Sequence, residues 1–161
     1  MQKKYILIFG IILSIFALMC TAAAVDVYVS NTGNDAAAGT AEAPVKNLAR
    51  AYAILGTNGG TIYVQDAVTV TATKNDCFIE PVHSGNVTIL GCTNDAALIF
   101  NNSGASHYHL RGTTKFSDLT ITDNTPDGVI ITADNHRLIM GKGLQMSSAR
   151  TDVTYSGGHR Y

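Results

Sequence analysis

Two histidines, His107 and His109, are of a type and at a spacing that could bind a ligand. Because they are two residues apart, an extended strand would place both imidazoles on the same face. Such a pair could make a weak contact to a metal ion or a sugar, but the sequence shows no third ligand at metal-binding spacing. We therefore predict two exposed histidines and no metal or other cofactor.

A stretch of charged residues follows between positions 111 and 137. Its members are Asp118, Asp123, Asp127, Asp134, Arg111, Lys115 and Arg137. If the chain forms stacked layers, carboxylates from successive layers could converge on a calcium ion, which takes six to eight oxygen ligands. Nothing in the spacing fixes that convergence, and Asn, Pro, Asp and Gly are also the residues that form turns. We interpret the carboxylates as solvated turn residues.

Residues 1–24 have the pattern of a cleavable signal peptide. A positive start precedes an almost unbroken apolar run over 5–19, and small residues up to Ala24 form the A-x-A arrangement that a signal peptidase reads. The apolar run is shorter than the ~20 residues of a spanning helix. We predict cleavage after Ala24, no stable membrane span afterwards, and a secreted or cell-surface location. A retained anchor and a lipid-modified Cys20 are the alternatives.

Charge excludes several classes of partner. Removal of residues 1–24 takes Lys3 and Lys4 from the 11 basic residues and none of the 12 acidic ones, which leaves a net charge of −3. The remaining chain has no basic stripe, so we expect neither nucleic acid nor an anionic membrane surface as a partner.

Two cysteines, Cys77 and Cys92, remain in the exported part. An even pair in an oxidising compartment predicts a disulfide, which would contribute roughly 3 kcal/mol by closing a loop of this length. The alternative is two buried thiols, since free cysteine is among the most buried residue types.

Residues 25–60 predict a strand followed by a short amphipathic helix. One apolar face, at spacing i, i+3, i+4 and i+7, consists of Leu48, Ala51, Tyr52 and Leu55. We assign the helix N-cap to Asn47 and the stop to Gly56. A helix this short is marginal alone, so its apolar face must cover something, as the end cap of a stacked fold would.

Residues 61–161 carry short β-rich runs separated by polar turns. The runs are 61–64, 68–72, 77–80, 87–90, 97–100, 116–121, 129–132, 137–140, 144–146 and 153–155. Equivalent strands would start at Thr61, Val87, Asp118 and Arg137, about 25 residues apart on average, as in stacked repeats. The competing fold is an antiparallel β-sandwich, because short strands with turns also fit it.

The start of the exported part resembles that of pectin-lyase-like β-helix proteins. The matching segments are 27–35 (VYVSNTGND), 38–40 (AGT), 43–48 (APVKNL) and 59–64 (GGTIYV). The resemblance implies an all-β fold, a right-handed parallel β-helix with a short N-terminal capping helix. Residues 25–60 would form the first strand and the cap, and 61–161 the coils. We recognise no C-terminal cap, so we expect the coils to be incomplete at that end.

Members of this family mostly act on polysaccharides, as calcium-dependent lyases or as hydrolases with clustered aspartates. Residues 124–128 (NTPDG) resemble the N-T-D-G motif of polygalacturonases, but the inserted Pro126 would turn every following side chain of a strand to the other face. The other catalytic motifs are missing. We therefore predict a non-catalytic protein with a carbohydrate-binding or adhesin-like role. The alternative is the N-terminal fragment of a polysaccharide lyase or glycoside hydrolase acting on pectin-like glycans, and only a lyase would require Ca²⁺.

Overall fold

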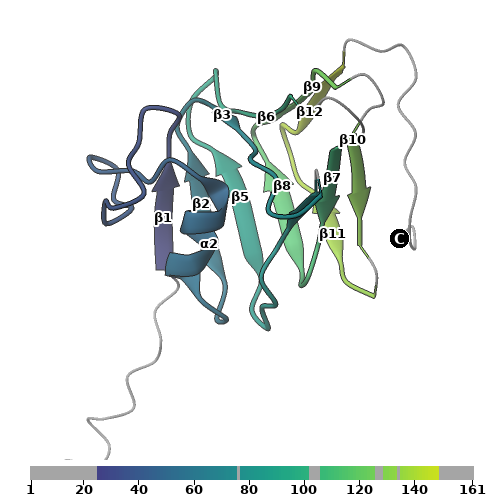
Figure 1. Ribbon diagram of the computed structural model, residues 1–161, viewed down its shortest axis with the longest axis horizontal. Coiled ribbons are helices and arrows are strands. Elements are labelled where there is room, and N and C mark those ends of the chain that lie inside the picture. Colours follow the sequence, from purple (N-terminus) through teal and green to yellow (C-terminus); the bar gives the residue numbers. More distant parts are fainter. Residues whose placement is uncertain (1–24, 76, 102–105, 126–128, 134, 149–161) are drawn as a thin grey trace, which may run out of the picture.

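The computed structural model describes residues 25–75, 77–101, 106–125, 129–133 and 135–148 (Figure 1). The predicted signal peptide and the run 153–155 lie outside the described residues. Within the described part, no helix is long and apolar enough to cross a membrane.

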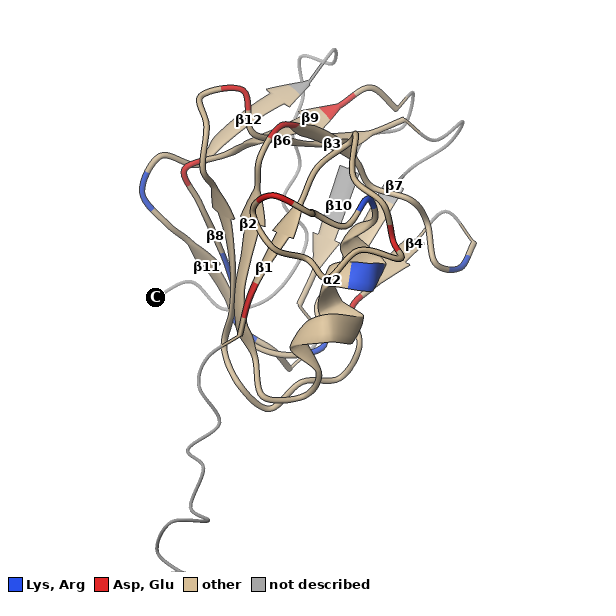
Figure 2. Cartoon of the chain, turned by 90° about the vertical axis from the view of Figure 1, so that its left-hand side faces the viewer, with Lys and Arg blue, Asp and Glu red and all other residues tan. Residues whose placement is uncertain are grey.

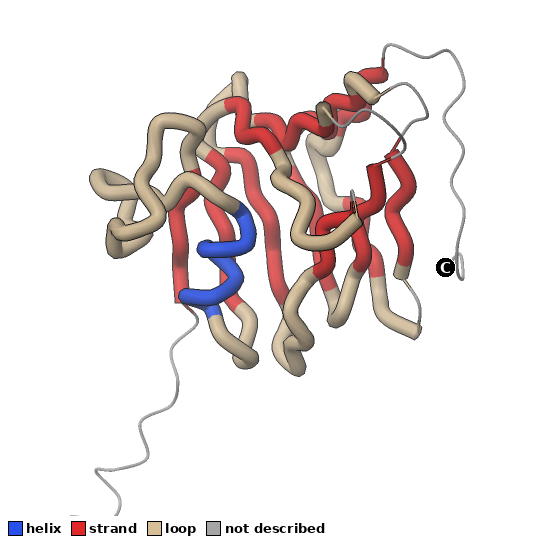
Figure 3. The backbone as a smooth tube through the Cα atoms, in the orientation of Figure 1, coloured by secondary structure: helices blue, strands red, loops and turns tan. Residues whose placement is uncertain are grey.

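The described chain consists mostly of short strands, with a single short helix (Figure 3). The helix is α2 (Leu48–Leu55), between β1 and β2. The strands are β1 (Val25–Val29), β2 (Gly60–Val64), β3 (Ala67–Thr69), β4 (Cys77–Ile79), β5 (Val87–Gly91), β6 (Ala97–Phe100), β7 (Ser106–His109), β8 (Thr114–Ser117), β9 (Thr120–Asp123), β10 (Val129–Thr132), β11 (Leu138–Met140) and β12 (Gln145–Ser148).

The strands form three sheets, which we call A, B and C. Sheet A has the order β1-β2-β5-β8-β11, sheet B the order β3-β6-β9-β12, and sheet C the order β4-β7-β10. From β2 onward the chain visits A, B and C in turn, and all the pairings between these strands are parallel. The fold is therefore all-β with parallel sheets, and the antiparallel sandwich is wrong.

The register of sheet A corrects one predicted strand. Equivalent positions are Gly60, Val87, Thr114 and Leu138, so the predicted start at Asp118 is wrong. The predicted single run 116–121 is divided between β8 and β9 by a turn at Asp118, whose φ is 50°. Phe116 and Ile121 are five residues apart, so one straight strand would point them to opposite faces. The turn lets both be buried.

Side chains that face the interior stack in register from strand to strand. They are Val27, Ile62, Ile89 and Phe116 in sheet A, Val68, Leu98 and Ile121 in sheet B, and Phe78 and Tyr108 in sheet C, all 2% exposed or less. Ring centroids of Phe78 and Tyr108, on neighbouring strands, are 4.9 Å apart. Burial of each such side chain contributes about 1.5–3 kcal/mol, so these ladders form the core.

The helix confirms the sequence prediction in its position and its buried face. It begins after Asn47, ends at Gly56 with a φ of 64°, and buries the four predicted apolar residues against the sheet. The Asn47 side chain makes no capping hydrogen bond within the helix, however. Its amide and its backbone N–H both donate to the carboxylate of Asp35, the backbone bond at 2.8 Å. The Lys46 N–H also donates to Asp35, at 2.9 Å, so these hydrogen bonds close a loop between two positions 11 apart in the sequence.

We predict that Asp35→Asn destabilises the fold by about 1 kcal/mol at neutral pH, as loss of a helix cap does. Burial raises the pKa of Asp35, but hydrogen bonds from Asn47 and Lys46 outweigh this effect and lower the pKa below its ordinary value. The carboxylate therefore stabilises the folded state above the unfolded pKa, near 4, and this contribution is lost as the pH falls through the folded pKa. Urea unfolding of the wild type and of Asp35→Asn should show a smaller difference in the free energy of unfolding at pH 3 than at pH 7. An equal difference in the free energy of unfolding at both pH values would show that the Asp35 carboxylate does not stabilise the fold.

Candidate functional site

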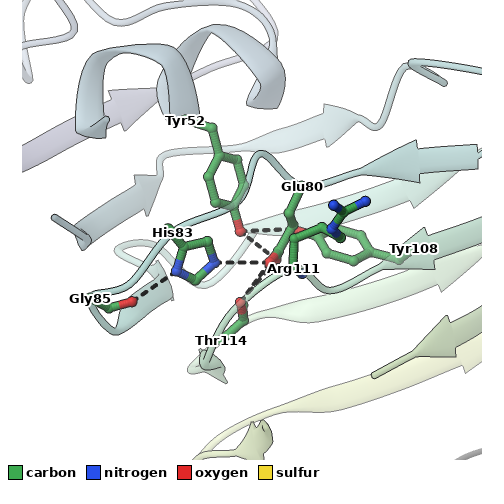
Figure 4. Close-up of polar contacts among 7 residues, drawn as sticks. All are labelled: Tyr52, Glu80, His83, Gly85, Tyr108, Arg111 and Thr114. Atoms are coloured by element: carbon green, nitrogen blue, oxygen red, sulfur yellow. Dashed lines mark hydrogen bonds and ion pairs between the residues drawn. The ribbon is translucent and has the colours of Figure 1, made fainter. Parts of the chain in front are cut away.

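A carboxylate, Glu80, is buried inside the fold directly after β4 (Figure 4) and is 2% exposed. The Tyr52 hydroxyl, from α2, donates to one carboxylate oxygen at 2.5 Å. The Thr114 hydroxyl, at the start of β8, lies 2.9 and 3.0 Å from the two oxygens. The Arg111 backbone N–H donates at 3.2 Å. Donors from α2 and from the stretch that leads into β8 thus meet on one carboxylate.

His83 completes this cluster and shows how its protons are arranged. Its Nδ1 lies 2.8 Å from the carbonyl oxygen of Gly85, which can only accept, so Nδ1 carries a proton. Its Nε2 lies 3.1 Å from Glu80 Oε2, which needs a second proton in that bond. The pair therefore holds two protons, one on His83 Nδ1 and one in the hydrogen bond between Nε2 and Oε2. Tyr52, Thr114 and Arg111 donate to the remaining lone pairs of Glu80.

The cluster is closed to ligands. The His83 side chain is 1% exposed and that of Glu80 is 0% exposed. Gly112 packs on the imidazole so closely that a Cβ there would lie 2.2 Å from Cε1. Burial first, and then the charge of Glu80, raise the pKa of Tyr52, which stays a neutral donor. We interpret the cluster as structural, since no substrate can reach a group sealed in this way.

An open polar hollow lies at the corner between sheets A and B. Its volume is about 340 Å³, and it is lined by Gly91, Cys92, Thr93, Asn94, Ala96, Asp118, Leu119, Thr120, Gly143 and Gln145. These residues belong to three successive corners, where β5 leads to β6, β8 to β9, and β11 to β12. The hollow is thus built by stacked turns.

Tight stacking of the turns holds Asp118 in place. Its backbone N–H donates to the Lys142 carbonyl at 2.8 Å. A Cβ at Gly143 would lie 2.1 Å from Asp118 Oδ1, and a Cβ at Gly91 would lie 2.0 Å from its carbonyl oxygen. Both neighbouring turns therefore require glycine, while the exposed side chains of Asn94 and Gln145 are left to meet a ligand.

The structure separates the carboxylates that the sequence grouped. Asp118 is an exposed turn residue, as predicted. Asp123 is not solvated: it ends β9, is 8% exposed, and accepts hydrogen bonds from the N–H and hydroxyl of Thr125 at 2.9 and 2.6 Å. Asp127 and Asp134 lie outside the described residues.

His107 and His109 share the outer face of sheet C, because Tyr108 between them is buried. Both are half-buried, so the prediction of exposed histidines is only partly right. In their present rotamers, no three His, Cys, Asp or Glu side chains of the described residues are grouped closely enough to hold a metal ion.

Cys77 and Cys92 are free thiols in the structure, in place of the predicted disulfide. Cys77 starts β4 in sheet C, whereas Cys92 follows β5 in sheet A and donates to the Val64 carbonyl at 3.2 Å. Neither is buried, so the alternative of two buried thiols is also wrong. An even number of cysteines and their separation along the sequence do not show on which sheet each cysteine lies.

No protein-family model, curated protein or solved structure matches this chain. Function is therefore argued from the described residues. Sequence reasoning missed Glu80, His83 and the hollow; the one available signal was a carboxylate at the end of the apolar run 77–80.

We predict that Glu80→Gln lowers the free energy of unfolding by roughly 3 kcal/mol, because its NH2 group replaces one acceptor oxygen inside a closed site. Whichever way the amide turns, that NH2 group faces donors, either the Tyr52 hydroxyl or His83 and the Arg111 N–H. Glu42→Gln, at an exposed position, is the matched control and should change it by less than about 0.5 kcal/mol. Urea unfolding followed by circular dichroism measures both. Coincident curves for the two variants would show that Glu80 has no structural role.

We also expect the melting temperature to be the same with and without dithiothreitol, because neither thiol is bridged. Differential scanning calorimetry of residues 25–161 measures this directly. A lower melting temperature in the reduced sample would show that Cys77 and Cys92 form a disulfide after all.

Proposed function

We propose that this chain is an exported right-handed parallel β-helix, related to the pectin-lyase-like proteins, that binds an extended polysaccharide without cleaving it. The β-helix is supported by the strict order of sheets A, B and C along the chain, and by equivalent strands of sheet A at 60, 87, 114 and 138. The ladders of buried side chains and the helix against the first strands support it as well. Export is supported by residues 1–24 of the sequence.

The observation that carries the proposed binding is the open polar hollow at the corner of sheets A and B. Its exposed groups are the amides of Asn94 and Gln145 and the carboxylate of Asp118, all suited to sugar hydroxyls. Stacked strands lie about 4.8 Å apart, so such groups recur along a line. A chain-like ligand fits that arrangement better than a compact one.

The number and placement of the carboxylates near the hollow support binding without cleavage. Glycoside hydrolysis usually needs two of them, about 5–5.5 Å apart in retaining enzymes and about 6.5–9.5 Å apart in inverting ones. Among the residues that line the hollow in the described chain, Asp118 is the sole carboxylate. Glu80 is sealed inside the fold.

A glycan also suits the surface charge better than a nucleic acid does. Figure 2 shows the charged residues of the described chain scattered over α2, several strands and several loops, with no basic stripe in that view. Nucleic-acid binding draws most of its affinity from such stripes. We therefore propose a polysaccharide or cell-surface glycan as the partner, at the outside of the cell.

We predict that Asn94→Ala and Gln145→Ala each weaken glycan binding about 5- to 10-fold, the equivalent of one lost hydrogen bond. Affinity electrophoresis of residues 25–161 through gels containing pectic or neutral polysaccharides measures the change. Asn86→Ala is the matched control, because Asn86 is exposed and precedes β5, whereas the hollow lies at the other end of that strand. Binding that survives in the double variant, or is absent from the folded wild type, would refute the proposed site.

A further inference from the structure

The register of sheet C brings a cysteine beside the histidine pair. Cys77 on β4 is the direct neighbour of His107 on β7, and Ile79 is the neighbour of His109. Phe78 and Tyr108, the residues between them, are buried at 2% and 1% exposure. Because side chains alternate along a strand, Cys77, His107 and His109 all lie on the outer face, where each is half-buried.

These three residues are of the types that zinc prefers. Zn²⁺ binds thiolate at about 2.3 Å and imidazole nitrogen at about 2.0–2.1 Å, in a tetrahedral arrangement. Adjacent strands are about 4.8 Å apart, and residues i and i+2 of one strand about 6.6 Å apart. A cysteine facing one of two histidines so spaced is therefore within side-chain reach of a common point above the sheet.

We propose that Cys77, His107 and His109 form a binding site for Zn²⁺ on the outer face of sheet C. These side chains do not form a metal-binding group as they stand in the described chain, so the proposal requires them to turn about χ1 and χ2 while the backbone stays in place. Three protein ligands leave the fourth tetrahedral position to water.

The other thiol and the buried imidazole do not share this arrangement. Cys92 is on sheet A and donates to the Val64 carbonyl. His83 is sealed inside the fold with its two nitrogens committed to Gly85 and Glu80. Cys92 therefore serves as the control cysteine, because it is exposed and belongs to a different sheet from the histidine pair.

Cobalt(II) titration of the reduced protein, residues 25–161, tests the site. Wild type should develop a thiolate-to-cobalt charge-transfer band, which added Zn²⁺ removes. Cys77→Ser should abolish the band, and His107→Gln and His109→Gln should each weaken cobalt binding by at least about tenfold. Cys92→Ser should leave both the band and the affinity unchanged.

Several outcomes would overturn the proposal. They are no band from folded wild type, a band that persists in Cys77→Ser, equal loss in Cys92→Ser, or unchanged cobalt binding in either histidine variant. Circular dichroism tests whether each variant is folded. We expect each one to fold, because the replaced side chains are not part of the core. The zinc site and the glycan hollow lie on different sheets, so either experiment can fail without the other.

Discussion

A carboxyl group inside a protein must be surrounded by hydrogen-bond partners, because leaving a buried polar group unpaired costs more than any single contact returns. Glu80 meets this requirement with donors from α2, from the turn after β4, and from the segment between β7 and β8. The Tyr52 hydroxyl also lies 3.1 Å from that of Tyr108, which joins β7 to the same network. Hydrogen bonds around one buried group therefore join α2, the turn after β4, β7 and the start of β8.

The apolar ladders complement this network. They supply the bulk of the buried area but little directional information, because each position accepts any side chain of suitable size. The carboxylate adds direction, since its donors must arrive from fixed angles. The polar hollow and the Cys77–His107–His109 face are both built on this rigid interior, as functional sites usually are.

Local features of this fold could be predicted from the sequence, and those that depend on register could not. The buried face of α2 follows from 3.6-residue periodicity within eight residues. The prediction of 116–121 as one strand missed the change of sheet at Asp118, although the five-residue spacing of Phe116 and Ile121 does not fit one buried face. Glu80 binds partners 28 and 34 residues away, and Cys77 faces a histidine 30 residues along. The residues around each of these positions do not indicate which distant residue will be its neighbour. The disulfide prediction for Cys77 and Cys92 failed for the same reason.

The central claim is that the stacked turns bind a polysaccharide and leave it intact. The most direct test incubates residues 25–161 with a panel of pectic and neutral polysaccharides, with and without calcium, and assays both retention of the glycan and release of unsaturated or reducing ends. We predict retention of at least one glycan and no release of ends under either condition. Sustained release by the folded protein, lost when Asp118 is replaced by Asn, would contradict the claim and make the hollow a catalytic site.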